Sequence, residues 1–165
     1  MIPIDRSETC FFTGHRVIDG DHASTLQPLL DSTIASLVDS GKVNFVCGGA
    51  VGFDTFAACR VIIAKKKNKD IRLILVLPCR DQTVKWKNMT DLTLYQRIKG
   101  FADEIIYASD LYTSSCMHDR NRMMADMSGV CVAYYGGGPG GTAFTVSYAK
   151  EKGIEIINLY DELKK

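Results

Sequence analysis

Short apolar runs alternate along the chain with longer segments of helical periodicity. The apolar runs cover residues 9–13, 43–47, 71–77, 104–107, 130–135 and 154–159, and most of them are apolar at nearly every position. Strands that are apolar on both sides are typical of a parallel sheet covered by helices on both faces. The pattern therefore predicts a mainly parallel sheet of about six strands.

Five helices are predicted between these strands. Apolar positions recur at helical spacing over 26–38 and 53–64, more weakly over 92–98, and again over 117–128 and 142–152, with a possible last turn near Glu162. Pro28 is compatible with the first helix because it falls near the helix start. This alternation predicts right-handed crossovers and a Rossmann-like, doubly wound α/β fold with helices on both faces, in one domain spanning residues 1–165.

Composition and charge exclude a membrane-spanning protein and leave the other classes open. The 165 residues are 46% hydrophobic, and no apolar run approaches the roughly 18 residues of a membrane span. Twenty basic and nineteen acidic residues balance, so we expect neither a membrane nor a nucleic-acid partner. None of the six cysteines forms a C-x-x-C pair, and three lie in apolar runs, so we expect a reduced, cytoplasmic protein without a metal site or cofactor.

Glycine and polar residues gather after the predicted strands. In a doubly wound sheet, ligands bind outside the carboxyl ends of the strands. The turn after the first strand carries Gly14, His15 and Arg16, and two later strands run into helices through glycine-rich turns. These turns contain Gly48, Gly49 and Gly52, and then Gly137, Gly138, Gly140, Gly141 and Thr142.

Each glycine-rich turn is a candidate anion site. Glycine lets the backbone approach a ligand closely, and a helix start offers unpaired N–H groups with positive partial charge. Neither turn matches G-x-G-x-x-G or the P-loop, so each could also be only a tight turn between strand and helix. Two such turns in one chain favour a phosphate or nucleotide site.

Arg120 is the most specific single candidate. It shares a helix face with three methionines, where an unpaired guanidinium is unfavourable unless it meets an anion or a carboxylate. The alternative is an ion pair with Asp54 or Asp126. His15 could bind a ligand or cap a loop, and Trp86 could stack on a base, although a packed lid aromatic is the preferred reading.

These motifs resemble the SLOG superfamily, which unites the LOG phosphoribohydrolases with the DprA/Smf DNA-processing proteins. The matching segments are Cys10–Gly14, Gly48–Phe53, Met117–Arg120 and Gly137–Thr142, in the family's order and on the corresponding elements. The Gly14-His15-Arg16 turn is most similar to a small bacterial and phage branch. The resemblance implies that Arg120, the neighbouring Asn121 and both glycine-rich turns contact the ligand.

The departures concern catalysis. LOG enzymes cleave the N-glycosidic bond of nucleoside 5′-monophosphates with a Glu at the position of Thr145, and they have Lys at the position of Asn121. A carboxylate normally stabilises the oxocarbenium-like transition state or activates water, and threonine does neither. Arg120 and Asp54 are the catalytic candidates if the protein is an enzyme, with Asp119 as another acid.

The sequence therefore predicts a protein that binds a nucleotide or a nucleotide-derived signal. The first alternative is a LOG-like phosphoribohydrolase with a relocated acid, and the second is a DNA-processing protein of the DprA type. The balanced charge counts against the DNA-processing alternative. We also expect a homodimer or a larger homo-oligomer, because LOG-like relatives pair through helices beside the site and the predicted Met-rich helix offers adaptable apolar surface.

Overall fold

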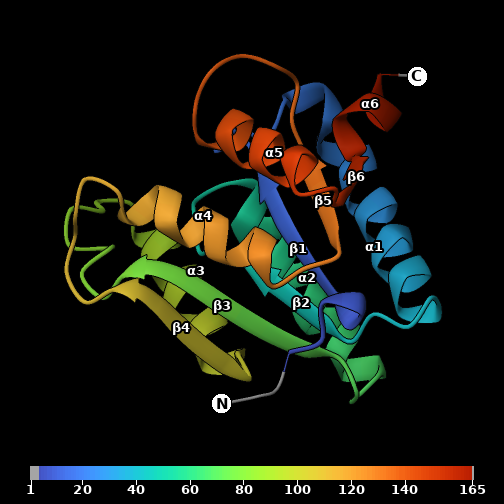
Figure 1. Cartoon of the computed structure of the whole chain (residues 1–165), viewed down its shortest axis with the longest axis horizontal. Coiled ribbons are helices and arrows are strands. Elements are labelled where there is room, and N and C mark those ends of the chain that lie inside the picture. The colour runs from blue at the N-terminus through green and yellow to red at the C-terminus, as the bar shows by residue number, and fades with distance from the viewer. Residues whose placement is uncertain (1–3, 165) are drawn as a thin grey trace.

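The computed structural model describes residues 4–164, and its centre is a six-stranded parallel sheet (Figure 1). The strand order is β4-β3-β2-β1-β5-β6, and every neighbouring pair is parallel. The strands are β1 (Thr9–Gly14), β2 (Asn44–Cys47), β3 (Arg72–Cys79), β4 (Glu104–Ser109), β5 (Val130–Tyr134) and β6 (Glu155–Asn158). The predicted doubly wound α/β fold is confirmed.

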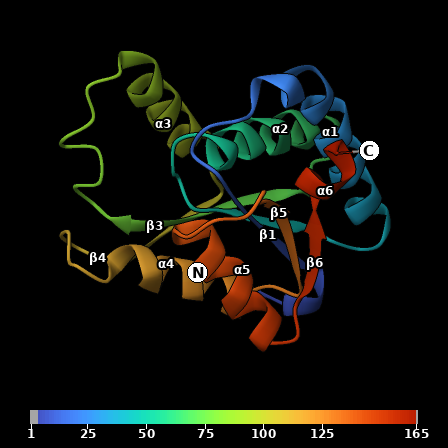
Figure 2. The same ribbon diagram turned by 90° about the horizontal axis from the view of Figure 1, so that it is seen from above.

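Helices cover both faces of this sheet. They are α1 (Ala23–Asp39), α2 (Phe53–Lys67), α3 (Met89–Phe101), α4 (Cys116–Asp126), α5 (Gly141–Glu151) and the short α6 (Leu159–Leu163), with one-turn 3-10 helices at Arg6–Glu8 and Gly20–His22. Seen from above, α1, α2, α3 and α6 lie on one side of the sheet, and α4 and α5 lie on the other (Figure 2).

The core consists of two layers, one on each face of the sheet. Alternate strand residues such as Phe12 and Phe45 pack against α1, α2 and α3, whereas Phe11 and Ile74 pack against α4 and α5. Strands covered on both sides must be apolar at nearly every position, which is why the runs in the sequence do not alternate.

The chain adds strands on one side of β1 up to β4, and on the other side of β1 from β5 onward. Strands β1 to β4 follow one another outward in one direction, and the chain then returns through α4 to place β5 on the other side of β1. The carboxyl ends of β1 and β5 are therefore the topological switch point, where such sheets bind ligands.

Most element boundaries shift by a few residues from the prediction, and two of the shifts involve proline. Strand β3 continues through Pro78 to Cys79. It pairs with β4 at Leu77 and again at Cys79, whereas β2 has already ended opposite Leu75. No partner strand therefore needs the N–H that proline lacks. Helix α1 begins at Ala23, so the exposed Pro28 lies inside the helix rather than near its start.

None of the helices described between residues 4 and 164 is long and apolar enough to cross a membrane. The six cysteines are free thiols, and five of them are buried.

Candidate functional site

A cavity of about 370 Å³ lies at the carboxyl edge of the sheet, beside the switch point. Its walls come from the ends of β1 and β2, the turn after β3, and the starts of α2, α4 and α5. The lining residues are Thr13, Gly14, Arg16, Ala50, Val51, Asp54, Gln82, Trp86, Met117, His118, Arg120, Asn121, Gly141 and Thr142.

Three helices begin at this cavity without a side-chain cap. The N-cap residues of α2, α4 and α5 are Gly52, Ser115 and Gly140, and none of them accepts a hydrogen bond from the first turn of its helix. Helix α3, in contrast, is capped by the side chain of Asn88. Uncapped first turns leave N–H donors and positive partial charge facing the cavity, which is the arrangement that binds anions.

Arg120 is buried in the cavity wall, with 5% of its surface exposed. Its Nη1 donates to the carbonyl of Gly48, its Nε donates to Asn121 Oδ1 at 2.7 Å, and its Nη2 donates to the Met117 sulfur at 3.7 Å. A guanidinium has five N–H donors, so this network leaves donors for an anion.

Neither ion pair considered for Arg120 forms as a direct contact. The Asp126 carboxylate accepts a hydrogen bond from the Tyr148 hydroxyl instead. Asp54 lies close enough that its charge counteracts the lowering of the Arg120 pKa by burial, but the hydrogen bonds of the guanidinium go to Gly48, Asn121 and Met117. The arginine is therefore held by neutral groups.

Asp54 is a buried carboxylate in the same wall. Desolvation raises its pKa to about 6, and Arg120 together with the backbone at Ala50 and Gly48 offsets part of the rise. Its Oδ1 accepts no hydrogen bond from any residue that the structure describes. A carboxyl group that titrates near neutrality can act as an acid or as a base.

Gly48 allows Arg120 and Asp54 to lie this close together. A Cβ at position 48 would lie 2.8 Å from Arg120 Nη1 and 3.0 Å from Asp54 Oδ2. The glycine thus makes room for these two side chains of the site.

The turn after β1 is fixed by the two glycine-rich turns. His15 Nε2 accepts the N–H of Gly136 at 2.8 Å, and the carbonyl of His15 accepts the N–H of Phe53 at 3.1 Å. Gly52 has a φ of +93°, and a Cβ there would lie 2.2 Å from the Arg16 carbonyl oxygen. His15 therefore positions the turn before α5.

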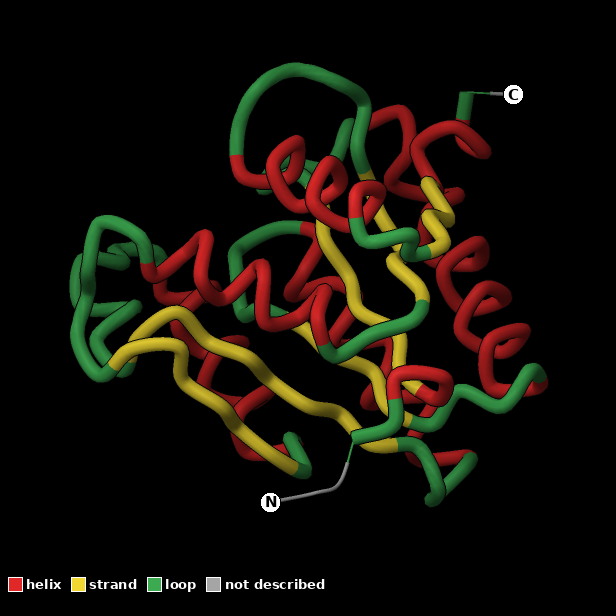
Figure 3. Tube along the Cα trace, viewed as in Figure 1, coloured by secondary structure: helices red, strands yellow, loops and turns green. Residues whose placement is uncertain are grey.

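The turn after β3 supplies two lining residues that the sequence-based site did not include, Gln82 and Trp86. Gln82 lies half-buried against the carbonyl of Gly49, and Trp86 packs edge-on against Tyr95. This turn is hydrogen-bonded to the one after β4, through Arg80 N to the Asp110 carbonyl and Tyr112 N to Asp81 Oδ1. The two turns project together beyond the ends of β3 and β4 (Figure 3).

The structure divides the predicted site residues into two groups. Seven line the cavity: Gly14, Arg16, Asp54, Arg120, Asn121, Gly141 and Thr142. The others lie behind it or on the exposed turn before α5: His15, Gly48, Gly49, Gly52, Gly137, Gly138 and Gly140. Thr145 is fully buried and donates to the Gly141 carbonyl, so it does not face the cavity.

Seven lining residues were not among the predicted site residues: Thr13, Ala50, Val51, Gln82, Trp86, Met117 and His118. A polar residue in a turn after a strand was the signal that could have found Gln82. Among residues 4–164, no group of three His, Cys, Asp or Glu side chains could hold a metal ion.

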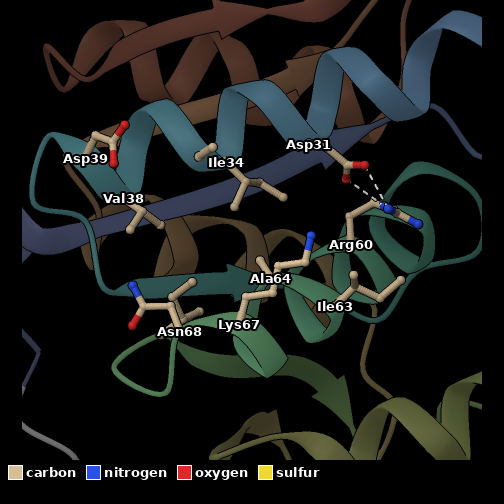
Figure 4. A pocket seen from close by; sticks show the side chains of 11 residues that line it. Asp31, Ile34, Val38, Asp39, Arg60, Ile63, Ala64, Lys67 and Asn68 are labelled. Atoms are coloured by element: carbon tan, nitrogen blue, oxygen red, sulfur yellow. Dashed lines mark hydrogen bonds and ion pairs between the residues drawn. The ribbon is translucent and has the colours of Figure 1, made fainter.

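A second cavity, of about 270 Å³, lies between α1 and α2 (Figure 4). Its floor is aliphatic, and a bidentate ion pair between Arg60 and Asp31, with both distances 2.7 Å, lies at its edge. Arg60 and Asp31 already pair with each other, and the cavity shares none of the residues at the carboxyl edge.

Comparison with known families identifies the chain. The model of the YspA SLOG family matches residues 11–160. The chain belongs to this family. A prophage-derived protein of Bacillus subtilis strain 168, named YoqJ and described as uncharacterized, is 32% identical over 143 residues, which cover 77% of this chain and 83% of that protein. The predicted resemblance to SLOG proteins is confirmed, and a prophage relative accords with the bacterial and phage branch.

Two solved DprA structures resemble this SLOG chain in fold. DprA of Helicobacter pylori superposes with a TM-score of 0.65 at 16% identity, covering 92% of this chain and 64% of that one. DprA of Streptococcus pneumoniae gives a TM-score of 0.63 at 17% identity, covering 90% of this chain and 48% of that one. The SLOG chain thus spans less than two thirds of the length of either structure.

One prediction about partners is wrong. The balanced charge was taken to argue against nucleic acid, but the H. pylori protein of the same fold is described as binding single-stranded DNA. Net charge sums over the whole surface, whereas a nucleic-acid site needs only local positive charge and stacking surfaces, so a value of +1 excludes nothing. At the coarse level, the SLOG family and the DprA-like fold support a protein that binds a nucleotide-related ligand.

Proposed function

We propose that this SLOG protein binds a nucleotide or a nucleotide-derived ligand in the cavity at the carboxyl edge. The observation that carries the proposal is the buried Arg120 guanidinium, whose Nη2 donates to a thioether, beside three uncapped helix starts. A buried cation with spare donors and converging helix N-termini matches a phosphate in both charge and geometry.

In this proposal, the phosphate binds at the start of α5. Gly141 and Thr142 line the cavity there, and a Cβ at position 141 would have no atom within 4 Å. Gly141→Asp should therefore leave the fold intact and abolish binding, because it adds a carboxylate where the phosphate binds. Gly100→Asp, in open space on α3, is the matched control. Unchanged binding by Gly141→Asp would refute this placement.

The direct test has two parts. Mass spectrometry of small molecules that co-purify with the protein identifies a natural ligand, and calorimetry with nucleoside mono-, di- and triphosphates measures affinity. Arg120→Ala should weaken binding by about 1.5–3 kcal/mol, the scale of a hydrogen bond to a charged group. If no nucleotide binds at millimolar concentration, the proposal fails.

Phosphoribohydrolase activity is a second candidate, and the titration of Asp54 favours it. Its pKa of about 6 suits an acid or base in glycosidic cleavage, and it lines the cavity that Thr145 does not face. The assay is release of free base from nucleoside 5′-monophosphates. Release that Asp54→Asn abolishes would establish an enzyme, whereas no release from wild type would leave a binding protein.

Single-stranded nucleic acid is a third candidate, favoured by the likeness to a DprA described as binding single-stranded DNA. Trp86 and His118 line the cavity and could stack on bases. Fluorescence anisotropy with labelled oligonucleotides tests it, and competition with a free nucleotide shows whether the same cavity is used.

A further inference from the structure

Two oxygen atoms at the cavity have no hydrogen-bond donor. Asp54 Oδ1 and Gln82 Oε1 are both buried and accept no hydrogen bond from any described residue, although both side chains line the cavity. Arg120, whose charge acts on Asp54, directs its Nη1 and Nε to Gly48 and Asn121. Buried acceptors of this kind are normally satisfied, so each calls for a donor.

Asp54 and the start of α5 reach the cavity from opposite faces of the sheet. Asp54 lies in the first turn of α2, on one face of the sheet, whereas Gly141 and Thr142 start α5 on the other face (Figure 2). A carboxylate repels a phosphate, so Asp54 cannot be part of the phosphate site while it is ionised. It faces a neutral, donor-bearing part of the ligand.

In a nucleotide, the group next to the phosphate is the sugar, and its hydroxyls are neutral donors. A carboxylate that accepts from ribose hydroxyls is a general solution in nucleotide sites at the carboxyl edge of such sheets. Base amino groups are also donors, but they lie farther from the phosphate. The sugar is therefore the part of a nucleotide whose position fits a carboxylate in the same cavity as the anion site.

We infer that Asp54, supported by Gln82, accepts hydrogen bonds from the ribose hydroxyls, so that the cavity selects ribonucleotides over 2′-deoxyribonucleotides. The inference rests on the proposed nucleotide function and adds a specificity-determining residue to it.

Calorimetry with matched pairs of nucleotides tests the inference. The probes are the four common ribonucleoside 5′-mono- and diphosphates and their 2′-deoxy counterparts, titrated into wild type, Asp54→Asn and Asp161→Asn. Asp161 is an exposed carboxylate in α6 and controls for the loss of one negative charge. Thermal unfolding of each variant checks that it is folded.

Wild type should bind its preferred ribonucleotide at least about tenfold more tightly than the deoxy form, because the deoxy form leaves buried acceptors unpaired. Asp54→Asn should bring the two within about threefold, mainly by weakening the ribonucleotide, while Asp161→Asn keeps the full ratio. Equal affinities in wild type, or a ratio that survives Asp54→Asn, would overturn the role of Asp54 and leave nucleotide binding intact. Absence of binding by every nucleotide would overturn the function itself.

Selection through the base is distinguished within the same titrations. If a base amino group were the donor that Asp54 accepts, affinity would vary between bases in wild type and the ribose-to-deoxyribose ratio would stay near one. That result would also overturn the inference.

Discussion

At the scale of single residues, the site depends on how closely the side chains of Arg120 and Asp54 approach the backbone of Gly48. Gly48 is buried, its carbonyl accepts from Arg120, and the space a Cβ would take is bordered by Arg120 Nη1 and Asp54 Oδ2. The guanidinium is thereby fixed through neutral groups and keeps donors for a ligand. A methyl group at this position tests that arrangement without changing any charge.

Gly48→Ala should lower nucleotide affinity by tenfold or more. The added Cβ would lie only 2.8 Å from Arg120 Nη1, so the arginine side chain would have to move. Gly100→Ala is the control, because it has open space around it on α3 and should stabilise the helix by up to about 1 kcal/mol. Calorimetry and thermal unfolding measure the two effects. Normal affinity in Gly48→Ala would show that Arg120 need not hold its observed position.

The burial of Asp54 has a measurable effect on stability. Its pKa rises from 3.8 to about 6, so the folded state holds one more proton than the unfolded state between these pH values. The contribution of Asp54 to the free energy of unfolding is therefore present at low pH and is lost as the pH rises to 6. The total loss is about 3 kcal/mol.

Asp54→Asn should remove that loss, so the stability of the variant relative to wild type should rise between pH 4 and pH 7. Urea unfolding at several pH values measures the difference, in which the other titrating groups cancel. A difference that does not change with pH would mean that Asp54 is not buried in the folded state in solution.

At the scale of elements, α1 and α2 are joined by one well-formed ion pair. Arg60 Nε and Nη2 bond to the two carboxylate oxygens of Asp31 at 2.7 Å, as Figure 4 shows beside the aliphatic cavity. The side chains are 15% and 40% exposed, so solvent screens part of the attraction. The planar guanidinium holds a fixed geometry between the helices.

Arg60→Ala and Asp31→Ala should each destabilise the protein modestly, and the double-mutant cycle should give a coupling of about 0.5–1 kcal/mol. Denaturant unfolding of the four proteins provides the cycle. Nucleotide affinity should not change, because this pair lies away from the carboxyl edge, so a change in affinity would link the two cavities.

At the scale of the whole molecule, exposed apolar side chains gather around the candidate site. Among residues 4–164, six of the eight exposed large hydrophobic residues lie in turns at the carboxyl edge or in the first turn of the following helix: Val17, Val84, Met89, Leu111, Tyr112 and Met117. The methionine stripe of α4, in contrast, packs inward: Met124 is 1% exposed, and Met123 and Met127 pack against the core. The exposed apolar surface that the sequence predicted on α4 therefore lies mainly on these turns instead.

A homodimer or larger assembly remains our prediction, and these turns are the surface it would bury. Light scattering should give about twice the 18.2 kDa of the chain or more. Replacing Leu111 and Tyr112 by Asp should reduce that mass, whereas Phe101→Asp, at the other end of α3, should not. A monomeric mass for wild type at high protein concentration would contradict the prediction.

The sequence by itself determined the elements, their order and the edge that carries the polar residues. Helical spacing and continuous apolar runs are local properties, so residues such as Phe11 and Phe12, buried against opposite layers, already show a strand covered on both sides. Four short motifs in the correct order, one of them around Arg120, also indicated the SLOG superfamily. These conclusions require no knowledge of which residues meet in space.

Only the tertiary structure decided which of those residues form the cavity. Arg120 meets Gly48 across 72 positions of sequence, and His15 meets Gly136 across 121. Glycines that look alike in the sequence differ in role: Gly141 lines the cavity, Gly48 makes room for Arg120, and Gly52 makes room for the backbone of Arg16. Local periodicity carries no information about such contacts, because they depend on strand order and on how the helices pack across the sheet.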